Sequence, residues 1–203
     1  MTAKPVLLLL AASLALSACA VTRKPDEPKV LRLAPSFTQS AAVAAGSYAV
    51  APVAAGGMAG ERRYTYVDRI APGELKQAAT LFWDEPPPRI VERALVAGLR
   101  TRFATVTGPD AALPADRRVS VRLERFEEQT SGGLDAAAVV ALDATVIAAT
   151  DRKVVLTGKY CGTAPIAGAS SSERVHAFEA ALQQAVDGLA KDLVGGVARS
   201  VGC

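Results

Sequence analysis

Short stretches of apolar and β-prone side chains predict a series of strands in the first half of the chain. Residues 30–33 and 48–53 have strand composition, and a loop of small residues separates them. Residues 64–67 predict a third strand and residues 74–80 a fourth, which would close a hairpin over the turn at 71–73. This half of the chain is therefore expected to supply one part of a sheet.

After Pro86 the apolar side chains recur every three and four residues, which is the period of an amphipathic helix. Asp84 and the prolines at 86–88 are typical helix-start residues. We therefore expect a helix that starts near Pro86 and reaches about Phe103. The face with this period would consist of Ile90, Val91, Ala94, Leu95, Gly98, Leu99, Arg102 and Phe103.

A strand with one buried face follows, because Val119, Val121 and Leu123 alternate with polar residues. Phe126 breaks this alternation, which predicts a bulge or bend near Glu124.

Beyond a turn at 131–133, residues 136–150 are apolar on both faces, as in a central strand that is covered on both sides. A helix is the alternative, because this segment is rich in alanine. We prefer the strand, since β-branched residues dominate 139–147 and a two-residue turn at 151–152 would lead into another strand at 153–163.

The last element predicted is a long helix. Ser170 and Glu173 have the spacing of a capping box, and an apolar stripe continues from Val175 to about Val197. Strands, a helix, three strands and a final helix predict a single α/β domain. Its sheet would be mixed and largely antiparallel, with the two main helices packed on it.

The N-terminus has the features of a bacterial lipoprotein signal peptide. Lys4 precedes an apolar run at 6–16, which at about 11 residues is too short to span a bilayer. Residues 16–19 read Leu-Ser-Ala-Cys, a lipobox, which implies cleavage before Cys19 and lipidation of that cysteine. We expect residues 1–18 to be the signal peptide, 19–29 the lipidated cysteine with a flexible tether, and 30–203 the domain.

Composition and charge exclude some classes of partner. The net charge is only +3 without a basic block, so nucleic acid is not an expected ligand. Half of the residues are hydrophobic but only 5% are aromatic, which predicts a core packed from small side chains. No second segment of the sequence is long and apolar enough to predict a membrane span.

Two cysteines, Cys161 and Cys203, are left after lipidation, and the periplasm is oxidising. A disulfide between them would contribute on the order of 4 kcal/mol in the chain-entropy model. Against it, a final helix of about 25 residues travels about 37 Å, which would carry Cys203 far from the strand that holds Cys161. Both outcomes stay open at this point.

The sequence offers few groups for catalysis. His176 is the only histidine, and its place beside the predicted helix start favours a solvated or capping role. Asp84 and Glu85 are neighbours, so their side chains should point apart and serve the helix start rather than act as paired carboxylates. The nucleophile-elbow, phosphate-loop and zinc-ligand motifs are missing. We expect a protein that is not an enzyme and has no cofactor or metal.

Several short motifs behind the lipobox resemble those of a known family. They lie at residues 30–33, 49–53, 66–69, 83–86, 93–95 and 121–126. In order and spacing the chain resembles the ABC-type transport auxiliary lipoprotein family, the outer-membrane partners of periplasm-spanning lipid transport systems with MCE proteins. Two interpretations of Trp83, in the fourth motif, stay open: it covers the core beside the first helix, or it helps to form a partner surface.

The resemblance implies a non-catalytic adaptor that tethers a periplasmic MCE-type protein and its ABC transporter complex to a membrane. Ala20 follows the lipidated cysteine, and in enterobacterial sorting a residue other than aspartate there directs a lipoprotein to the outer membrane. We expect the domain to face the periplasm from that membrane. The alternative is a lipoprotein that itself binds or carries a lipid, and self-association into a homo-oligomer stays open.

Overall fold

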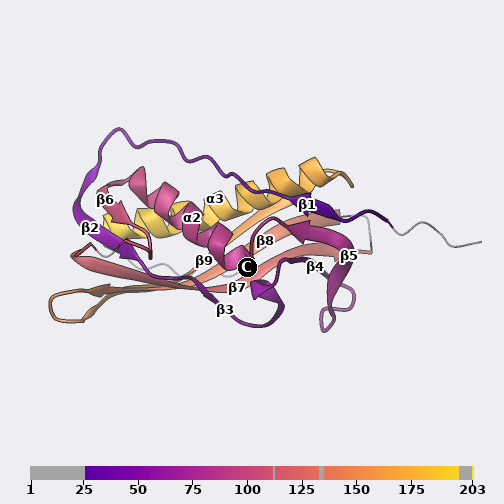
Figure 1. The fold of residues 1–203 in the computed structure, drawn as a ribbon, viewed down its shortest axis with the longest axis horizontal. Coiled ribbons are helices and arrows are strands. Elements are labelled where there is room, and N and C mark those ends of the chain that lie inside the picture. The colour runs from indigo at the N-terminus through magenta and orange to yellow at the C-terminus, as the bar shows by residue number, and fades with distance from the viewer. Residues whose placement is uncertain (1–25, 112, 133–134, 197–202) are drawn as a thin grey trace, which may run out of the picture.

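The computed structural model describes residues 26–111, 113–132, 135–196 and 203. In this part of the chain nine strands form one sheet, and two helices pack against one face of it (Figure 1). The α/β fold class expected from the sequence is confirmed.

The first half supplies five strands and one short 3-10 helix. They are β1 (Lys29–Leu31), β2 (Ala44–Val50), β3 (Ala54–Ala55), η1 (Gly57–Gly60), β4 (Arg63–Asp68) and β5 (Leu75–Trp83). The hairpin expected over the turn at 71–73 is present, because β4 and β5 pair antiparallel. The sequence analysis did not predict β3, which is only two residues long.

The second half supplies the two main helices and the longest strands. They are α2 (Pro87–Arg100), β6 (Phe103–Thr107), β7 (Arg117–Ser131), β8 (Asp135–Ala148), β9 (Val154–Ile166) and α3 (Ser171–Gly195). The strand interpretation of residues 136–150 is confirmed. Ser170 and Glu173 form the predicted capping box, while the predicted helix end at Val197 lies outside the described residues.

The longest pairings in the sheet are antiparallel. β8 pairs antiparallel with both β7 and β9, along most of its length. Shorter parallel pairings join β7 to β2, β3 and β4, β2 to β6, and β5 to β1. The order β1-β5-β4-β7-β2-β6 places β1 at one end of this row and β6 at the other.

Two predictions about β7 and α2 have different outcomes. The register of β7 against β8 shifts between Leu123 and Arg125, which confirms the bulge near Glu124. The predicted helix end at Phe103 is wrong, because α2 ends at Arg100 and Phe103 begins β6. The Thr101 hydroxyl donates to the Gly98 carbonyl at 2.6 Å and helps to end the helix there.

The expectation that β8 is covered on both faces is also wrong. The face that meets the helices is buried, through Ala138, Val140, Leu142, Ala144 and Val146. On the opposite face most side chains of β8 are only half-buried, since both helices lie on the same side of the sheet. Alanine is tolerated at these positions because its small side chain exposes little apolar area.

Small residues allow α3 to lie very close to the sheet. The buried stripe of α3 includes Ala177, Ala181 and Ala185. Gly162 of β9 lies directly beneath this stripe, where a Cβ would overlap the backbone carbonyl of Ala181. The prediction of a core packed from small side chains is confirmed at this contact.

Candidate functional site

Trp83 lies inside the core, at the end of β5. Its side chain is 1% exposed, and its ring centroid lies 5.2 Å from that of Tyr64, 5.3 Å from Phe126 and 4.9 Å from Phe178. Aromatic rings at these separations stabilise one another beyond the area they bury. The position of Trp83 favours the first interpretation, in which it covers the core. Its ring presents almost no surface to a partner.

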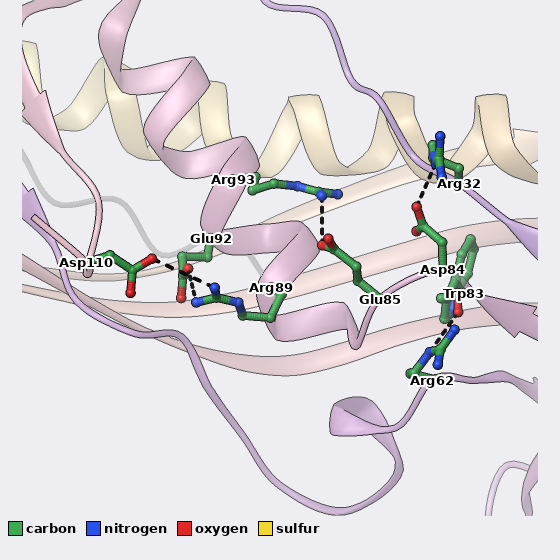
Figure 2. Close-up of polar contacts among 9 residues, drawn as sticks. All are labelled: Arg32, Arg62, Trp83, Asp84, Glu85, Arg89, Glu92, Arg93 and Asp110. Carbon is green, nitrogen blue, oxygen red and sulfur yellow. Dashed lines mark hydrogen bonds and ion pairs between the residues drawn. The ribbon is translucent and has the colours of Figure 1, made fainter.

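The turn after Trp83 fastens the N-terminal strand to the domain (Figure 2). Arg32 Nε donates to Asp84 Oδ2 at 2.8 Å, and the backbone N–H of Asp84 donates to the Leu31 carbonyl at 2.8 Å. Arg62 Nε donates to the Trp83 carbonyl at 3.1 Å. The residues 83–86 therefore connect the segment that follows the tether with β5 and the start of α2.

Asp84 and Glu85 do not form a carboxylate pair. Figure 2 shows Asp84 turned toward Arg32 and Glu85 turned toward Arg93, whose Nη1 lies 2.7 Å from Glu85 Oε2. Further along α2, Arg89 lies 2.7 Å from Glu92 and 3.8 Å from Asp110. The arginines of these pairs are exposed, while Glu92 is buried, and pairs with an exposed arginine stabilise a fold by only about 0–1 kcal/mol.

A cleft lies between β4, β5, β7 and the start of α3, with a volume of about 850 Å³, and most of its lining residues carry a charge or a hydroxyl group. Asp26 and Glu27, the first described residues of the chain, line one side of it. At its inner wall the Tyr64 hydroxyl donates to Glu128 Oε2 at 2.5 Å, and Arg174 Nε donates to the same oxygen at 3.0 Å. Arg174 also donates to the Ala169 carbonyl, which fixes its guanidinium at the base of α3.

Burial is the main cause that raises the pKa of the Tyr64 phenol above its usual value, and the negative charge of Glu128 and the hydrogen bond to it add to the effect. The phenol therefore keeps its proton throughout the neutral range. Because Glu128 accepts from both Tyr64 and Arg174, its buried charge is compensated. The three side chains form a structural contact, and each has a partner within the group.

The sequence analysis missed Glu128, although the pattern contained a signal for it. Phe126 marks the change of phase after the bulge, and Glu128 stands two residues further along the strand. Alternation therefore places both side chains on the buried face. An acidic residue at such a position predicts a buried cationic or hydroxyl partner.

Other candidate groups for chemistry are either exposed or scattered. His176 has a side chain that is 79% exposed, with Nδ1 at 3.5 Å from Glu179, in agreement with a solvated role. Among residues 26–111, 113–132, 135–196 and 203, no group of three or more His, Cys, Asp or Glu side chains is arranged to hold a metal ion.

Cys161 and Cys203 meet in the structure, with their Cα atoms 5.4 Å apart, within the range of disulfides. Cys161 points away from α3, since the neighbouring residues Tyr160 and Gly162 face the helix. The expectation that the length of the last helix keeps Cys203 far from Cys161 is therefore wrong. Cys19 lies outside the described residues.

The chain matches the model of a known protein family. The model of the family described as "ABC-type transport auxiliary lipoprotein component" matches residues 30–190. The chain belongs to this family. An auxiliary lipoprotein component is associated with an ABC-type transport system and is located in the cell envelope, and the family is one of transport components rather than enzymes. None of the helices that the structure describes is long and apolar enough to cross a membrane.

Solved structures share the fold of this auxiliary component. The chain is similar to protein XCC0632 from Xanthomonas campestris, with 22% identity and a TM-score of 0.73 over 83% of this chain and 96% of that one. A second crystal structure, of an uncharacterized protein, has 15% identity and a TM-score of 0.65 over 82% and 99% of the two chains. At these identities the likeness concerns the fold alone. Among curated proteins, none matches the chain significantly.

Proposed function

We propose that this auxiliary lipoprotein is a non-catalytic adaptor of an ABC-type lipid transport system. A lipid on Cys19 would hold it on the outer membrane, with the domain in the periplasm and residues 19–29 as the tether. Its partner would be a periplasmic protein of the MCE class that belongs to the transporter complex. The observation that carries the proposal is the family match over residues 30–190, which begins directly behind a lipobox and a short polar segment.

The interior of the domain supports an adaptor over a lipid carrier, which is the second candidate. A carrier needs an apolar cavity for acyl chains. Here the space between the helices and the sheet is filled by one continuous set of buried side chains, with Trp83, Phe126 and Phe178 in contact. The large cleft beside Glu128 and Arg174 is lined mostly by residues with charged or hydroxyl side chains, with Ala78, Leu81 and Ala169 as the apolar ones, so an acyl chain there would lie against charged groups.

The test is purification of the tagged full-length protein from outer membranes in mild detergent, followed by identification of the proteins and lipids that accompany it. We expect an MCE-type protein or another component of the ABC transporter complex in stoichiometric amount, and no ATPase or esterase activity of the adaptor alone. Phospholipid bound at one molecule per chain, without any transport protein, would instead support the carrier.

A further inference from the structure

The strand β9 lies at an edge of the sheet. Among the residues that the structure describes, β9 pairs with β8 alone, along most of its length. An edge strand presents a row of backbone N–H and C=O groups that can pair with another extended chain. The outer edge of β9 is therefore a surface to which a further strand could be added.

Every second residue of β9 points its backbone groups toward this edge. The N–H of Thr163 points away from β8, because it donates to Gln184 Oε1 of α3 at 3.0 Å. The alternation of an antiparallel ladder then turns the backbone groups of Thr157, Lys159 and Cys161 outward as well. Since Gln184 occupies the edge at Thr163, a further strand has room along the residues that precede it.

The helix α3 carries the chain back to the start of β9. It begins just after β9 ends and runs antiparallel to that strand. At its end, Gly195 and Gly196 line one hollow together with Val155 and Leu156 at the start of β9. Gly196 has a φ of 67°, the left-handed conformation that turns a chain out of its helix. The residues after Gly196 therefore start beside the first residues of β9.

The last residue of the chain lies further along the same strand. The Cα atom of Cys203 is 5.4 Å from that of Cys161, in the middle of β9. From Val155 to Cys161 the strand advances about 20 Å. The seven peptide steps from Gly196 to Cys203 span at most about 25 Å. Residues 197–202, which lie outside the described part of the chain, must therefore run nearly extended and in the direction of β9.

We propose that residues 197–202 dock on the outer edge of β9 and pair with it as a further, parallel strand. Their composition suits this role, because Val197 and Val201 are β-branched and the segment contains no proline. The segment would give partners to the outward backbone groups of β9 and close this edge against pairing with a second copy of the chain. The proposal goes beyond the adaptor function and is independent of which transport protein binds the domain.

The test is hydrogen exchange of the mature protein, purified in mild detergent and resolved to single amides. In the wild type we expect the outward amides of Thr157, Lys159 and Cys161 to exchange at least about tenfold more slowly than the amide of Gly73, in the exposed β4–β5 loop. The amide of Tyr160, which faces β8, should stay slow in every variant and reports that the sheet is intact.

Two neighbouring prolines separate strand pairing from mere coverage of the edge. In a paired strand only alternate N–H groups face the neighbour, so one of Arg199→Pro and Ser200→Pro removes a hydrogen bond to β9 and the other does not. We expect one of these variants to raise the exchange rates of the three outward amides at least about tenfold, and the other to leave them slow. The matched controls are Arg199→Ala and Ser200→Ala, which keep both N–H groups and should exchange as the wild type does.

Three results would overturn the proposal. Outward amides that exchange as fast as Gly73 in the wild type would show that the edge is open. Equal exchange rates in the two proline variants would show that the segment does not pair with β9. Slow exchange that is lost on dilution, together with a fall in the mass measured by light scattering, would assign the edge to a second copy of the chain.

Discussion

Glu128 joins two parts of the molecule that are far apart in the sequence. Its carboxylate accepts from Tyr64 on β4 and from Arg174 on α3, and its side chain is only 8% exposed. Such a contact is costly to break, because the partners that remain stay buried without compensation.

Replacing Glu128 by glutamine should therefore lower the free energy of unfolding by about 2 kcal/mol, since the side chain keeps its shape but loses the charge that Arg174 needs. Tyr64→Phe should lower it less, because Glu128 and Arg174 stay paired. Urea denaturation measures both values. The control is Glu124→Gln, at an exposed pair on the same strand, which should change the stability by less than about 0.5 kcal/mol. Equal effects at 124 and 128 would contradict the role of burial.

The same contact predicts a dependence of stability on alkaline pH. The folded protein raises the pKa of Tyr64 above that of an unfolded phenol, which is about 10. Tyr64 therefore contributes stability that is fully present below pH of about 10 and is lost as the pH rises beyond it, because the unfolded chain loses this proton first. Tyr64→Phe should show a smaller fall in stability between pH 9 and 11 than the wild type. Parallel curves for the two proteins would refute this.

For single residues, the sequence predicts whether a side chain is exposed better than it predicts which side chains it contacts. The solvated position of His176 and the divergence of Asp84 and Glu85 follow from neighbouring residues alone. The partners of Glu128 do not, because Tyr64 and Arg174 are brought to it by strand pairing and by the crossing of α3 over the sheet. The same crossing brings Phe178 of α3 against Trp83, which helps to bury the tryptophan in the core.

The helix α3 packs very closely against β9. Gly162 has no side chain between the strand and the helix backbone at Ala181, so the helix rests almost directly on the sheet. A backbone carbonyl cannot rotate away as a flexible side chain would, because its position is set by the hydrogen bonds of the helix.

We therefore expect Gly162→Ala to lift α3 from the sheet and to lower the free energy of unfolding by about 3 kcal/mol. Chemical denaturation measures the change. The matched control is Gly73→Ala in the β4–β5 loop, where an added Cβ meets nothing within 4 Å. That variant should stay within about 0.5 kcal/mol of the wild type. A wild-type stability for Gly162→Ala would show that α3 can shift freely.

Most elements with a clear period were predictable, and two short strands were not. The bulge in β7, the capping box of α3 and the strand character of β8 all follow from local patterns. β3 and β6 were missed, because two to five residues carry no reliable period and their pairing partners, β7 and β2, come from other parts of the chain. Phe103 continued the helical spacing by coincidence and in fact packs against Tyr48 from β6.

At the scale of the whole molecule, the two ends of the sheet differ. The described chain begins beside the cleft that Glu128 and Arg174 line, while the turn between β8 and β9 lies at the far end of the sheet. The sequence predicted the tether from charge and proline content, but the cleft joins residues of β4, β5, β7 and α3 that no local pattern brings together.

Anchoring at Cys19 has a direct test. Cys19→Ser should abolish incorporation of labelled palmitate and remove the protein from the outer-membrane fraction, because serine cannot form the thioether. Density-gradient fractionation measures the second effect. Cys161→Ser is the control and should keep both label and location. Unchanged labelling of Cys19→Ser would mean that the signal peptide does not lead to lipidation.

We propose a disulfide between Cys161 and Cys203, whose Cα atoms are 5.4 Å apart. It would close a long loop that contains the whole of α3, which in the chain-entropy model stabilises the fold by about 4 kcal/mol. Intact-mass measurement after alkylation without reductant should find no modified thiol at either position. Two alkylated cysteines would show that the pair is reduced in the mature protein.

The contacts of β1 have a mechanical consequence. A lipid on Cys19 would make the tether the point at which any force between membrane and partner enters the domain. That force would reach β1 first, and from there the parallel pairing of β1 with β5 and the Arg32–Asp84 contact. Because the bonds of this pairing run across the strands, a pull along β1 would load them together in shear. The short N-terminal strand would then transmit tension to β5 and, through Asp84, to the turn before α2.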